Sequence, residues 1–345
     1  MTGNSRASER KILIVRVGRG GDLIMITPAV NALLAAHPEA ELHLLTSADG
    51  RRIMANYSPR ITKTYSYTRR FPRTLLQQRS LLKQFKAERY SSLYIFETKP
   101  HYRKWLGNLA QDVHSLEEAS AGSHYCNRCL DLVAGSLEAP VIRGWVSLPV
   151  TETGRRKARA LLKENGVDPE AKLVGLHPTF SGAGLPFFRD RKGNRHRLWP
   201  GEHFAKLAGI LADVASAKGL KLALVVDALP EEKPYVQSIM DKSGGSITLL
   251  AAPPDFQRYK GLLSLLDVLV TPNTGPMHIA AALNTPVVAL FSTWSPEDCG
   301  PFMDPGRYRV LRAEETVDPG QGLASIEPDQ VADTVLDLLQ KTSCR

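Results

Sequence analysis

The sequence contains little cysteine and no long hydrophobic run. Its 345 residues include four cysteines, which are Cys126, Cys129, Cys299 and Cys344. Four thiols in a chain of this length do not make a disulfide framework, so we expect a protein that folds in a reducing compartment. The first residues are polar, and the apolar stretch behind them, 12–17, is too short for a secretory signal or a membrane span. The sequence therefore predicts a cytoplasmic protein.

Repeats and complete metal-binding motifs are also missing. No motif recurs with a period of about 20–50 residues, which excludes solenoids and propellers. Cys126 and Cys129 have the spacing of half a zinc site, but no matching second pair lies nearby in the sequence. We interpret them as ordinary semi-buried thiols, with a metal or redox role as the alternative.

The composition is that of a globular protein with an excess of positive charge. Hydrophobic residues make up 43% of the chain and charged residues 23%, which is enough apolar material for sizeable cores. Since a domain averages about 150 residues, the length predicts about two domains. The net charge of +9 favours an anionic ligand or surface, and leaves nucleic acid, phosphates and acidic membranes open.

Apolar segments of strand length alternate with helix-like segments along the chain, which is typical of βαβ units and parallel sheets. The alternation occurs in two series. The first predicts strands over 11–17, 41–46, 61–67 and 92–96 and a helix over 23–36. The second predicts strands over 172–177, 221–227, 247–250, 267–271 and 286–291, and helices over 201–217, 231–241, 255–265 and 276–283.

A charged stretch without a strand pattern, from about Leu148 to Glu170, separates the two series. We therefore predict an α/β fold of two doubly wound, Rossmann-like domains, residues 1–152 and 153–325, that face each other across a cleft. An amphipathic helix within 326–345 ends the chain and is expected to pack back on the first domain. Parallel sheets bind ligands beyond the carboxyl ends of their strands, so the cleft is the predicted site.

Glycines follow the first predicted strand, in the sequence VGRGGDL at 17–23. A dinucleotide fingerprint would need glycine where Leu23 stands, and the Gly-Lys-Ser/Thr of a P-loop is absent. Gly20 and Gly21 instead leave room for a ligand to approach Asp22 at the head of the next helix. Asp22 is therefore a candidate for acid–base chemistry. A second interpretation is that it caps the helix by accepting backbone N–H bonds.

The most informative segment is 268–282, where a buried strand leads directly into a helix. The first helical turn contains Thr274, Gly275 and Pro276. Proline loses no hydrogen bond there and glycine allows close approach, so the N–H groups and the helix dipole form an anion site that fits a diphosphate. His278, one turn further, could donate to a phosphate or a sugar hydroxyl, and the alternative is a structural histidine.

A basic segment ends at Arg197, just before Trp199 and Pro200 and the predicted helix over 201–217. One interpretation is a solvated run of charge. Its position in the loop after the strand at 172–177, on the ligand side of the second sheet, favours phosphate binding instead.

Together these segments resemble glycosyltransferase family 9, the ADP-heptose:lipopolysaccharide heptosyltransferases. The matching segments are 14–23, 27–29, 175–178, 197–200, 274–282 and 286–291. The resemblance implies the GT-B fold, in which the first domain binds most of the acceptor and the second most of the nucleotide sugar. It also implies an inverting transfer without a metal or another cofactor.

The resemblance further implies roles for single residues. Asp22 is similar to the general base, Arg197 to the cation on the diphosphate, and Thr274 and Gly275 to its backbone donors, while His278 lines the same pocket. Arg197 stands where a lysine is common, and keeps the charge. The family usually has aspartate in place of Asn273. Because that carboxylate helps to hold the donor sugar in the family, the sugar stays open.

Positive charge is concentrated in residues 51–73, a window without an acid. It suits an anionic lipid-linked or lipopolysaccharide acceptor at the inner membrane surface. The residues that we expect to bind the acceptor are Gly20, Gly21, Arg51, Arg69, Arg70 and Arg73. Aromatic residues are interleaved, as on single-stranded nucleic-acid surfaces, but no nucleic-acid-binding module is found, and we expect no nucleic acid.

The expected activity is transfer of a heptose from ADP-heptose to an anionic lipopolysaccharide core. One alternative is a family-9 transferase that uses another nucleotide sugar on a capsule, a protein or a small molecule. Another is a nucleotide-sugar-binding protein without catalysis, against which the presence of Asp22 argues.

Overall fold

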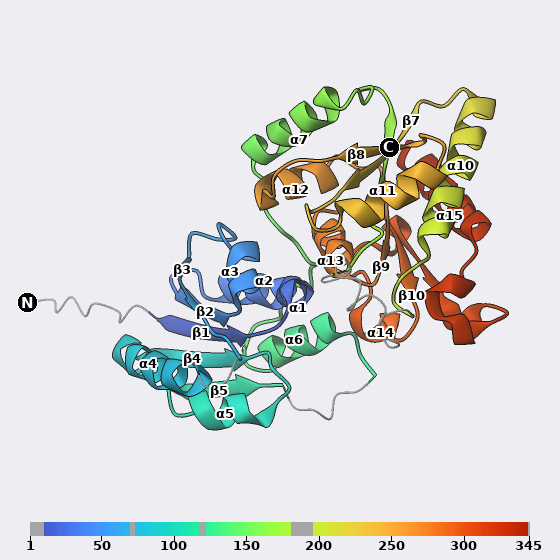
Figure 1. The fold of residues 1–345 in the computed structure, drawn as a ribbon. Helices are drawn as coiled ribbons and strands as arrows, with labels where there is room; N and C mark the ends of the chain where they lie inside the picture. The colour runs from blue at the N-terminus through green and yellow to red at the C-terminus, as the bar shows by residue number, and fades with distance from the viewer. Residues whose placement is uncertain (1–9, 70–72, 117–121, 181–195, 344–345) are drawn as a thin grey trace, which may run out of the picture. The chain divides into compact units, whose positions relative to one another are not determined.

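The computed structural model describes residues 10–69, 73–116, 122–180 and 196–343. The chain divides into two compact units, Met1–Leu148 and Pro149–Arg345 (Figure 1). The boundary predicted from the sequence lies a few residues further along the chain.

The described part of the first unit contains a five-stranded parallel sheet with the order β3-β2-β1-β4-β5. The strands are β1 (Lys11–Arg16), β2 (Glu41–Thr46), β3 (Ile61–Ser66), β4 (Tyr90–Ile95) and β5 (Ala110–Ser115). The central strand β1 is almost continuously apolar because helices cover both faces of the sheet, as in other parallel sheets.

The helices of this unit are α1 (Gly20–Met25), α2 (Thr27–Ala36), α3 (Ala48–Ile53), α4 (Arg73–Glu88), α5 (Pro100–Leu106) and α6 (Tyr125–Ala134). α2 packs against α6, and α1 against α3. Side chains of α4 and α5 join a separate cluster with the strands. The single helix expected over 23–36 is two helices, α1 and α2, which meet at Ile26. Pro28, at the start of α2, has no amide hydrogen to continue the ladder from α1.

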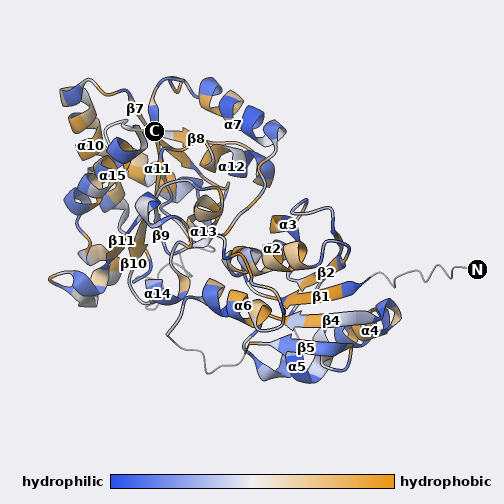
Figure 2. Ribbon diagram, turned by 180° about the vertical axis from the view of Figure 1, so that it is seen from behind, coloured by the Kyte–Doolittle hydropathy of each residue, from blue (hydrophilic) through white to orange (hydrophobic). Residues whose placement is uncertain are grey.

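The second unit contains a parallel sheet that has six strands among the residues described, in the order β11-β10-β9-β6-β7-β8. The strands are β6 (Lys172–Leu176), β7 (Leu222–Asp227), β8 (Ile247–Leu250), β9 (Val268–Pro272), β10 (Val287–Phe291) and β11 (Tyr308–Arg312). β9 and β10 are buried along their whole length, and both are coloured as largely hydrophobic in Figure 2.

The longer helices of the second unit are α7 (Glu152–Glu164), α10 (Gly201–Lys218), α11 (Lys233–Lys242), α12 (Phe256–Leu263), α13 (Gly275–Ala282) and α15 (Pro328–Ser343). The shorter ones are α14 (Pro296–Cys299), η1 (Pro305–Arg307), η2 (Ala313–Glu315) and η3 (Pro319–Ser325). The fully buried Trp199 donates from Nε1 to the Ile326 carbonyl at 2.8 Å, which ties the start of α10 to the chain just before α15. α15 packs against α10 and strands β9 to β11, and its expected packing on the first domain stays a prediction.

Candidate active site

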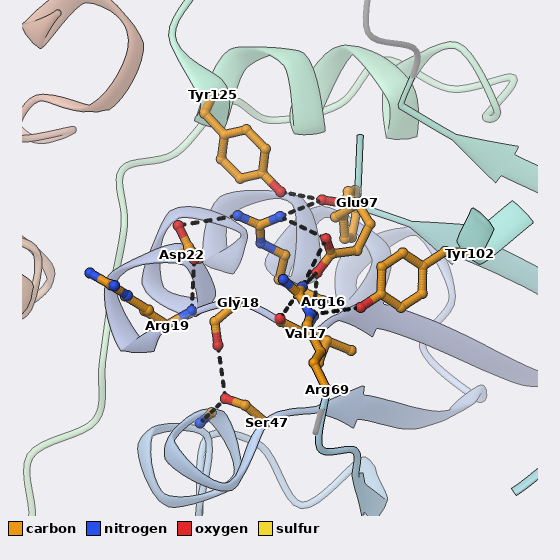
Figure 3. Close-up of polar contacts among 12 residues, drawn as sticks. Arg16, Val17, Gly18, Arg19, Asp22, Ser47, Arg69, Glu97, Tyr102 and Tyr125 are labelled. Atoms are coloured by element: carbon orange, nitrogen blue, oxygen red, sulfur yellow. Dashed lines mark hydrogen bonds and ion pairs between the residues drawn. The ribbon is translucent and has the colours of Figure 1, made fainter. Parts of the chain in front are cut away.

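Asp22 lies in the first turn of α1, directly beyond the carboxyl end of β1 (Figure 3). Its Oδ2 accepts a hydrogen bond from the Arg19 backbone N–H at 2.7 Å, and its Oδ1 lies 3.1 Å from Nη2 of Arg16. The side chain keeps 32% of its surface exposed. The geometry is therefore compatible with both interpretations of Asp22. The hydrogen bond that supports the start of the helix also orients a solvent-accessible carboxylate.

Arg16, the last residue of β1, is the fixed support of this carboxylate. Its guanidinium donates to the Phe96 carbonyl at 3.2 Å, lies 3.5 Å from the Glu97 carboxylate and stacks 4.7 Å from the centre of the Tyr125 ring. Burial acts to lower the pKa of Arg16, but the charges of Tyr125, Asp22 and Glu97 raise it further than burial lowers it. The cation therefore persists at every working pH and holds Asp22 in one orientation.

Glu97 is the buried counter-charge of the site, with 4% of its side chain exposed. It accepts from the Val17 backbone N–H at 2.5 Å and from Nη2 of Arg69 at 3.1 Å. Arg69 also donates to the Val17 carbonyl and to the Tyr102 hydroxyl, at 3.0 Å for the latter. Burial raises the pKa of Tyr102 to about 12, so this hydroxyl stays protonated. These contacts hold the chain where β1 ends and the glycine turn begins.

The glycines of the turn have packing reasons that the sequence alone did not show. A Cβ on Gly18 would lie 2.2 Å from Oδ2 of Asp22, and one on Gly20 would lie 2.4 Å from Cδ1 of Ile53. The Gly18 carbonyl accepts from the Ser47 hydroxyl at 2.8 Å. Gly18 is thus required by the position of the Asp22 carboxylate. At Gly20 a Cβ would displace the end of the Ile53 side chain, whereas a role of Gly20 and Gly21 toward an acceptor stays a prediction.

Several cations of the window at 51–73 are paired with neighbouring groups among the described residues. Arg60 donates to the carbonyls of His37 and Pro38 at 2.6 and 2.9 Å, and Lys63 pairs with Glu88. Arg69 forms an ion pair with Glu97, as described above. Arg51 is exposed in the last turn of α3 and remains a candidate for acceptor binding, while Arg73 begins α4 and Arg70 lies outside the described residues.

In the second unit, Thr274 occupies the N-cap position of α13, directly after β9. Its hydroxyl donates to the Pro272 carbonyl at 3.2 Å and lies 3.1 Å from the Thr271 hydroxyl, so it does not cap the first amides of the helix. A Cβ added to Gly275 would have no atom within 4 Å, and its φ is not in the left-handed region. Neither backbone conformation nor packing among the described residues requires glycine there. Among the described residues, a Cβ at Gly275 would therefore stand in open space.

Two further predicted donor-site residues flank this helix start. Asn273 donates from its backbone N–H to the Leu290 carbonyl at 3.0 Å, and its Nδ2 lies 3.5 Å from Sγ of Cys299. His278 is buried one turn into α13. Near the same edge of the sheet, burial lowers the pKa of His177, just after β6, to about 4, so that side chain is neutral at physiological pH.

Arg197 is positioned through the residue before it. The His196 carbonyl accepts from the Ser292 hydroxyl at 2.7 Å and from the Leu323 backbone N–H at 3.2 Å. Ser292 directly follows β10, the neighbour of β9, so Arg197 lies at the edge of the sheet where β9 leads into α13. Its guanidinium lies 5.3 Å from the centre of the Phe180 ring. The rest of the predicted basic segment, 189–195, lies outside the described residues.

The structure also bears on metals, thiols and membrane spans. Among the described residues, no group of three or more His, Cys, Asp or Glu side chains could hold a metal ion. Cys126 and Cys129 are buried in α6, and burial raises the pKa of both thiols, that of Cys129 to about 12. They are therefore neutral packing residues. None of the described helices is both long and apolar enough to cross a bilayer.

Comparisons with known proteins agree with this architecture. The model of glycosyltransferase family 9 (heptosyltransferase) matches residues 102–320. The chain is 23% identical over 364 residues to lipopolysaccharide heptosyltransferase 2 of Escherichia coli K12, covering 95% of this chain and 98% of that protein. It is 22% identical over 366 residues to the protein of the same name from Salmonella typhimurium, covering 96% and 99%.

Solved structures share the fold over almost the whole chain. A family-9 glycosyltransferase from Veillonella parvula has a TM-score of 0.80 at 16% identity, covering 96% of this chain and 97% of that one. The ADP-heptose heptosyltransferase II of E. coli has a TM-score of 0.71 at 21% identity, covering 96% and 99%. The resemblance and the GT-B fold class predicted from the sequence are confirmed. The chain belongs to glycosyltransferase family 9 and is a transferase.

Proposed function

We propose that the protein transfers a heptose from ADP-heptose to the core of an anionic lipopolysaccharide, with inversion and without a metal. The observation that carries the proposal is the Asp22 carboxylate, which is solvent-accessible and oriented on both oxygens. The E. coli and Salmonella relatives are named as lipopolysaccharide heptosyltransferases, and a further neighbour was solved with ADP. These names support the choice of donor and acceptor.

In the proposed reaction, Asp22 accepts the proton of the acceptor hydroxyl as its oxygen forms a bond to the anomeric carbon of the heptose. The bond from that carbon to the diphosphate oxygen breaks, and its electron pair leaves with ADP. A positioned base of this kind contributes about 10²- to 10⁴-fold to a rate. Arg16 and the Arg19 N–H keep the carboxylate aimed, so little reorientation is needed when the hydroxyl arrives.

The departing diphosphate is proposed to lie against the start of α13 and Arg197. The first amides of α13 and its dipole attract an anion, and the absence of a side chain on Gly275 lets a phosphate approach the backbone. The Arg197 guanidinium adds a permanent cation that can bind two oxygens at once. This charge stabilises the leaving group, which is the part that a metal ion would otherwise play.

Asn273 and His278 are proposed to contact the donor sugar or the phosphates. The Asn273 amide replaces the carboxylate usual in the family, which makes a different nucleotide sugar the alternative to ADP-heptose. The acceptor is proposed to lie in the inner membrane, so that the protein works at the cytoplasmic face of that membrane. Arg51, on α3 of the first unit, is the exposed cation proposed to contact it.

The test is a transfer assay with purified protein, heptose-deficient lipopolysaccharide and a panel of ADP-heptose, GDP-mannose and UDP-glucose. We expect the acceptor mass to increase by one heptose with ADP-heptose and with no added metal, in the presence of EDTA. Transfer of a hexose only from GDP- or UDP-sugars would reassign the donor. Donor binding without transfer to any acceptor would support the non-catalytic alternative.

A further inference from the structure

The outer side of α4 carries large apolar side chains that the described residues of the first unit leave exposed. Leu75 and Leu76, in the first turns of the helix, are 57% and 71% exposed. The inner side of the same helix is a normal core face, since Leu81 and Phe85 are buried in the cluster under the sheet. α4 therefore buries one stripe and leaves a second apolar site in solvent.

Cations follow these leucines along the outer side of the helix. Arg79, Lys83 and Lys86 are exposed, and their spacing of three and four residues places them with Leu76 on one helical face. The part of the chain that the structure describes offers no acidic partner to these three side chains. We call Leu75, Leu76, Arg79, Lys83 and Lys86 the α4 outer face.

The one carboxylate of α4 does not neutralise the cations of the α4 outer face. Glu88 is the only carboxylate of α4, and it is turned to Lys11, at 3.0 Å, and to Lys63. Its side chain is 13% exposed. The α4 outer face thus combines two protruding leucines with three unneutralised cations, and α4 in Figure 2 accordingly carries both hydrophobic and hydrophilic colour.

We propose that the α4 outer face docks the protein on an anionic lipid bilayer. Leu75 and Leu76 insert at the boundary between headgroups and acyl chains, and Arg79, Lys83 and Lys86 contact lipid phosphates. Amphipathic helices bind membranes in this way, with an apolar part below and cations at headgroup level. The proposal rests on the proposed function for its choice of a membrane as partner, but its test does not require transfer activity.

The charge of the face selects the bilayer over a second copy of the chain. Two such faces brought together would place three cations against three cations without a carboxylate between them. A bilayer rich in phosphatidylglycerol supplies the opposite charge over the whole face. Attraction of about 1 kcal/mol per cation near such a surface corresponds to about fivefold in binding for each of the three.

The test is co-sedimentation of the full chain with vesicles of phosphatidylcholine alone or with 30% phosphatidylglycerol added, at about 50 and 300 mM salt. We expect binding to the anionic vesicles only, and weaker binding at high salt. The Leu75→Gln/Leu76→Gln variant should bind at least about tenfold more weakly than the parent at both salt concentrations. The Arg79→Glu/Lys83→Glu/Lys86→Glu variant should bind at least roughly 100-fold more weakly at low salt, because it loses three attractions and gains repulsion.

Matched variants on the second unit control for charge and polarity. Arg156→Glu/Lys163→Glu/Lys218→Glu changes three other exposed cations, and Leu229→Gln/Val317→Gln removes two other exposed apolar side chains. The decrease in vesicle binding of the first control should be less than a quarter of the decrease seen for the α4 triple variant. The second control should bind vesicles like the parent. The proposal is overturned if the parent does not bind anionic vesicles, or if the control variants lose as much vesicle binding as the α4 variants. It is also overturned if the leucines mediate dimerisation instead.

These readouts separate the proposal from the proposed function. Vesicle binding without sugar transfer would leave the docking surface intact and overturn the activity. Transfer of heptose to lipopolysaccharide without vesicle binding would support the activity and overturn the docking surface. With both in place, the leucine variant should retain transfer to a deacylated, water-soluble acceptor while losing transfer to acceptor embedded in vesicles.

Discussion

Replacement of Gly275 by alanine separates ligand binding from folding at the start of α13. A Cβ at this position would meet no atom within 4 Å, and the residue has a φ that alanine adopts without strain. Alanine also restricts the unfolded chain more than glycine does. We therefore expect the free energy of unfolding to stay the same or to rise by up to about 1 kcal/mol.

The same methyl group should weaken binding of the donor nucleotide. In the proposed complex a phosphate lies against the Gly275 backbone, in the space that the new Cβ would fill. An extra methyl group in a well-packed contact costs about 1–3 kcal/mol, which is about 5- to 150-fold in Kd. Isothermal titration of ADP into both proteins measures this loss, and thermal unfolding without ligand checks the stability.

Gly209→Ala is the matched control. Gly209 lies in α10 of the same unit and likewise has open space around a Cβ, so this variant should bind ADP like the parent. Equal ADP affinity for Gly275→Ala and the parent would refute the assignment of the diphosphate to this helix start. A large loss of stability would refute the inference that the position is open.

Three further changes test the electrostatics. Arg197→Ala should weaken ADP binding by about 1.5–3 kcal/mol, the range for a charge-assisted hydrogen bond, and calorimetry that finds no change removes Arg197 from the site. Arg69→Ala should destabilise the first unit by about 1–3 kcal/mol, because the buried Glu97 carboxylate loses a partner; unchanged urea unfolding would contradict this. Hydrogen bonds from Lys63 and Lys11 lower the pKa of Glu88 from 4.5 to about 2, so its stabilisation is complete above pH 4.5 and is lost as the pH falls through 2. Glu88→Gln should therefore cost about 1–2 kcal/mol at pH 7, after allowance for solvent screening, and less at pH 3; a constant difference across this range would argue against the ion pair.

The sequence predicted well those strands that are rich in apolar, β-branched or aromatic residues, both the buried β9 and β10 and the edge strands β3 and β8. β2 and β8 have the predicted bounds, and β9 and β10 differ at their ends by one residue. β5 was missed because its sequence AQDVHS has no apolar alternation and its residues are half-buried or exposed at the edge of the sheet. β11 was also missed: its sequence YRVLR is only five residues long and contains two arginines.

The placement of the candidate site residues was predictable where a motif directly follows a strand along the chain. The glycine turn with Asp22 and the start of α13 both follow buried strands, and such positions can be found from sequence spacing. Glu97 could not be found in this way, because its partners Val17 and Arg69 are distant in sequence and only the pairing of β1 with β4 brings it beside them. The pairing of Arg69 with Glu97 could not be predicted either, for the same reason.

The central claim is that Asp22 acts as the base in sugar transfer rather than only supporting α1. Single-turnover transfer from saturating ADP-heptose, measured for the parent, Asp22→Asn and the exposed control Asp49→Asn, tests it most directly. Asparagine can still accept the Arg19 N–H, so we expect Asp22→Asn to fold and to bind ADP within about twofold of the parent. Its transfer rate should fall by roughly 10²- to 10⁴-fold, whereas Asp49→Asn should transfer at the parent rate. A folded Asp22→Asn protein that transfers heptose as fast as the parent would contradict the account.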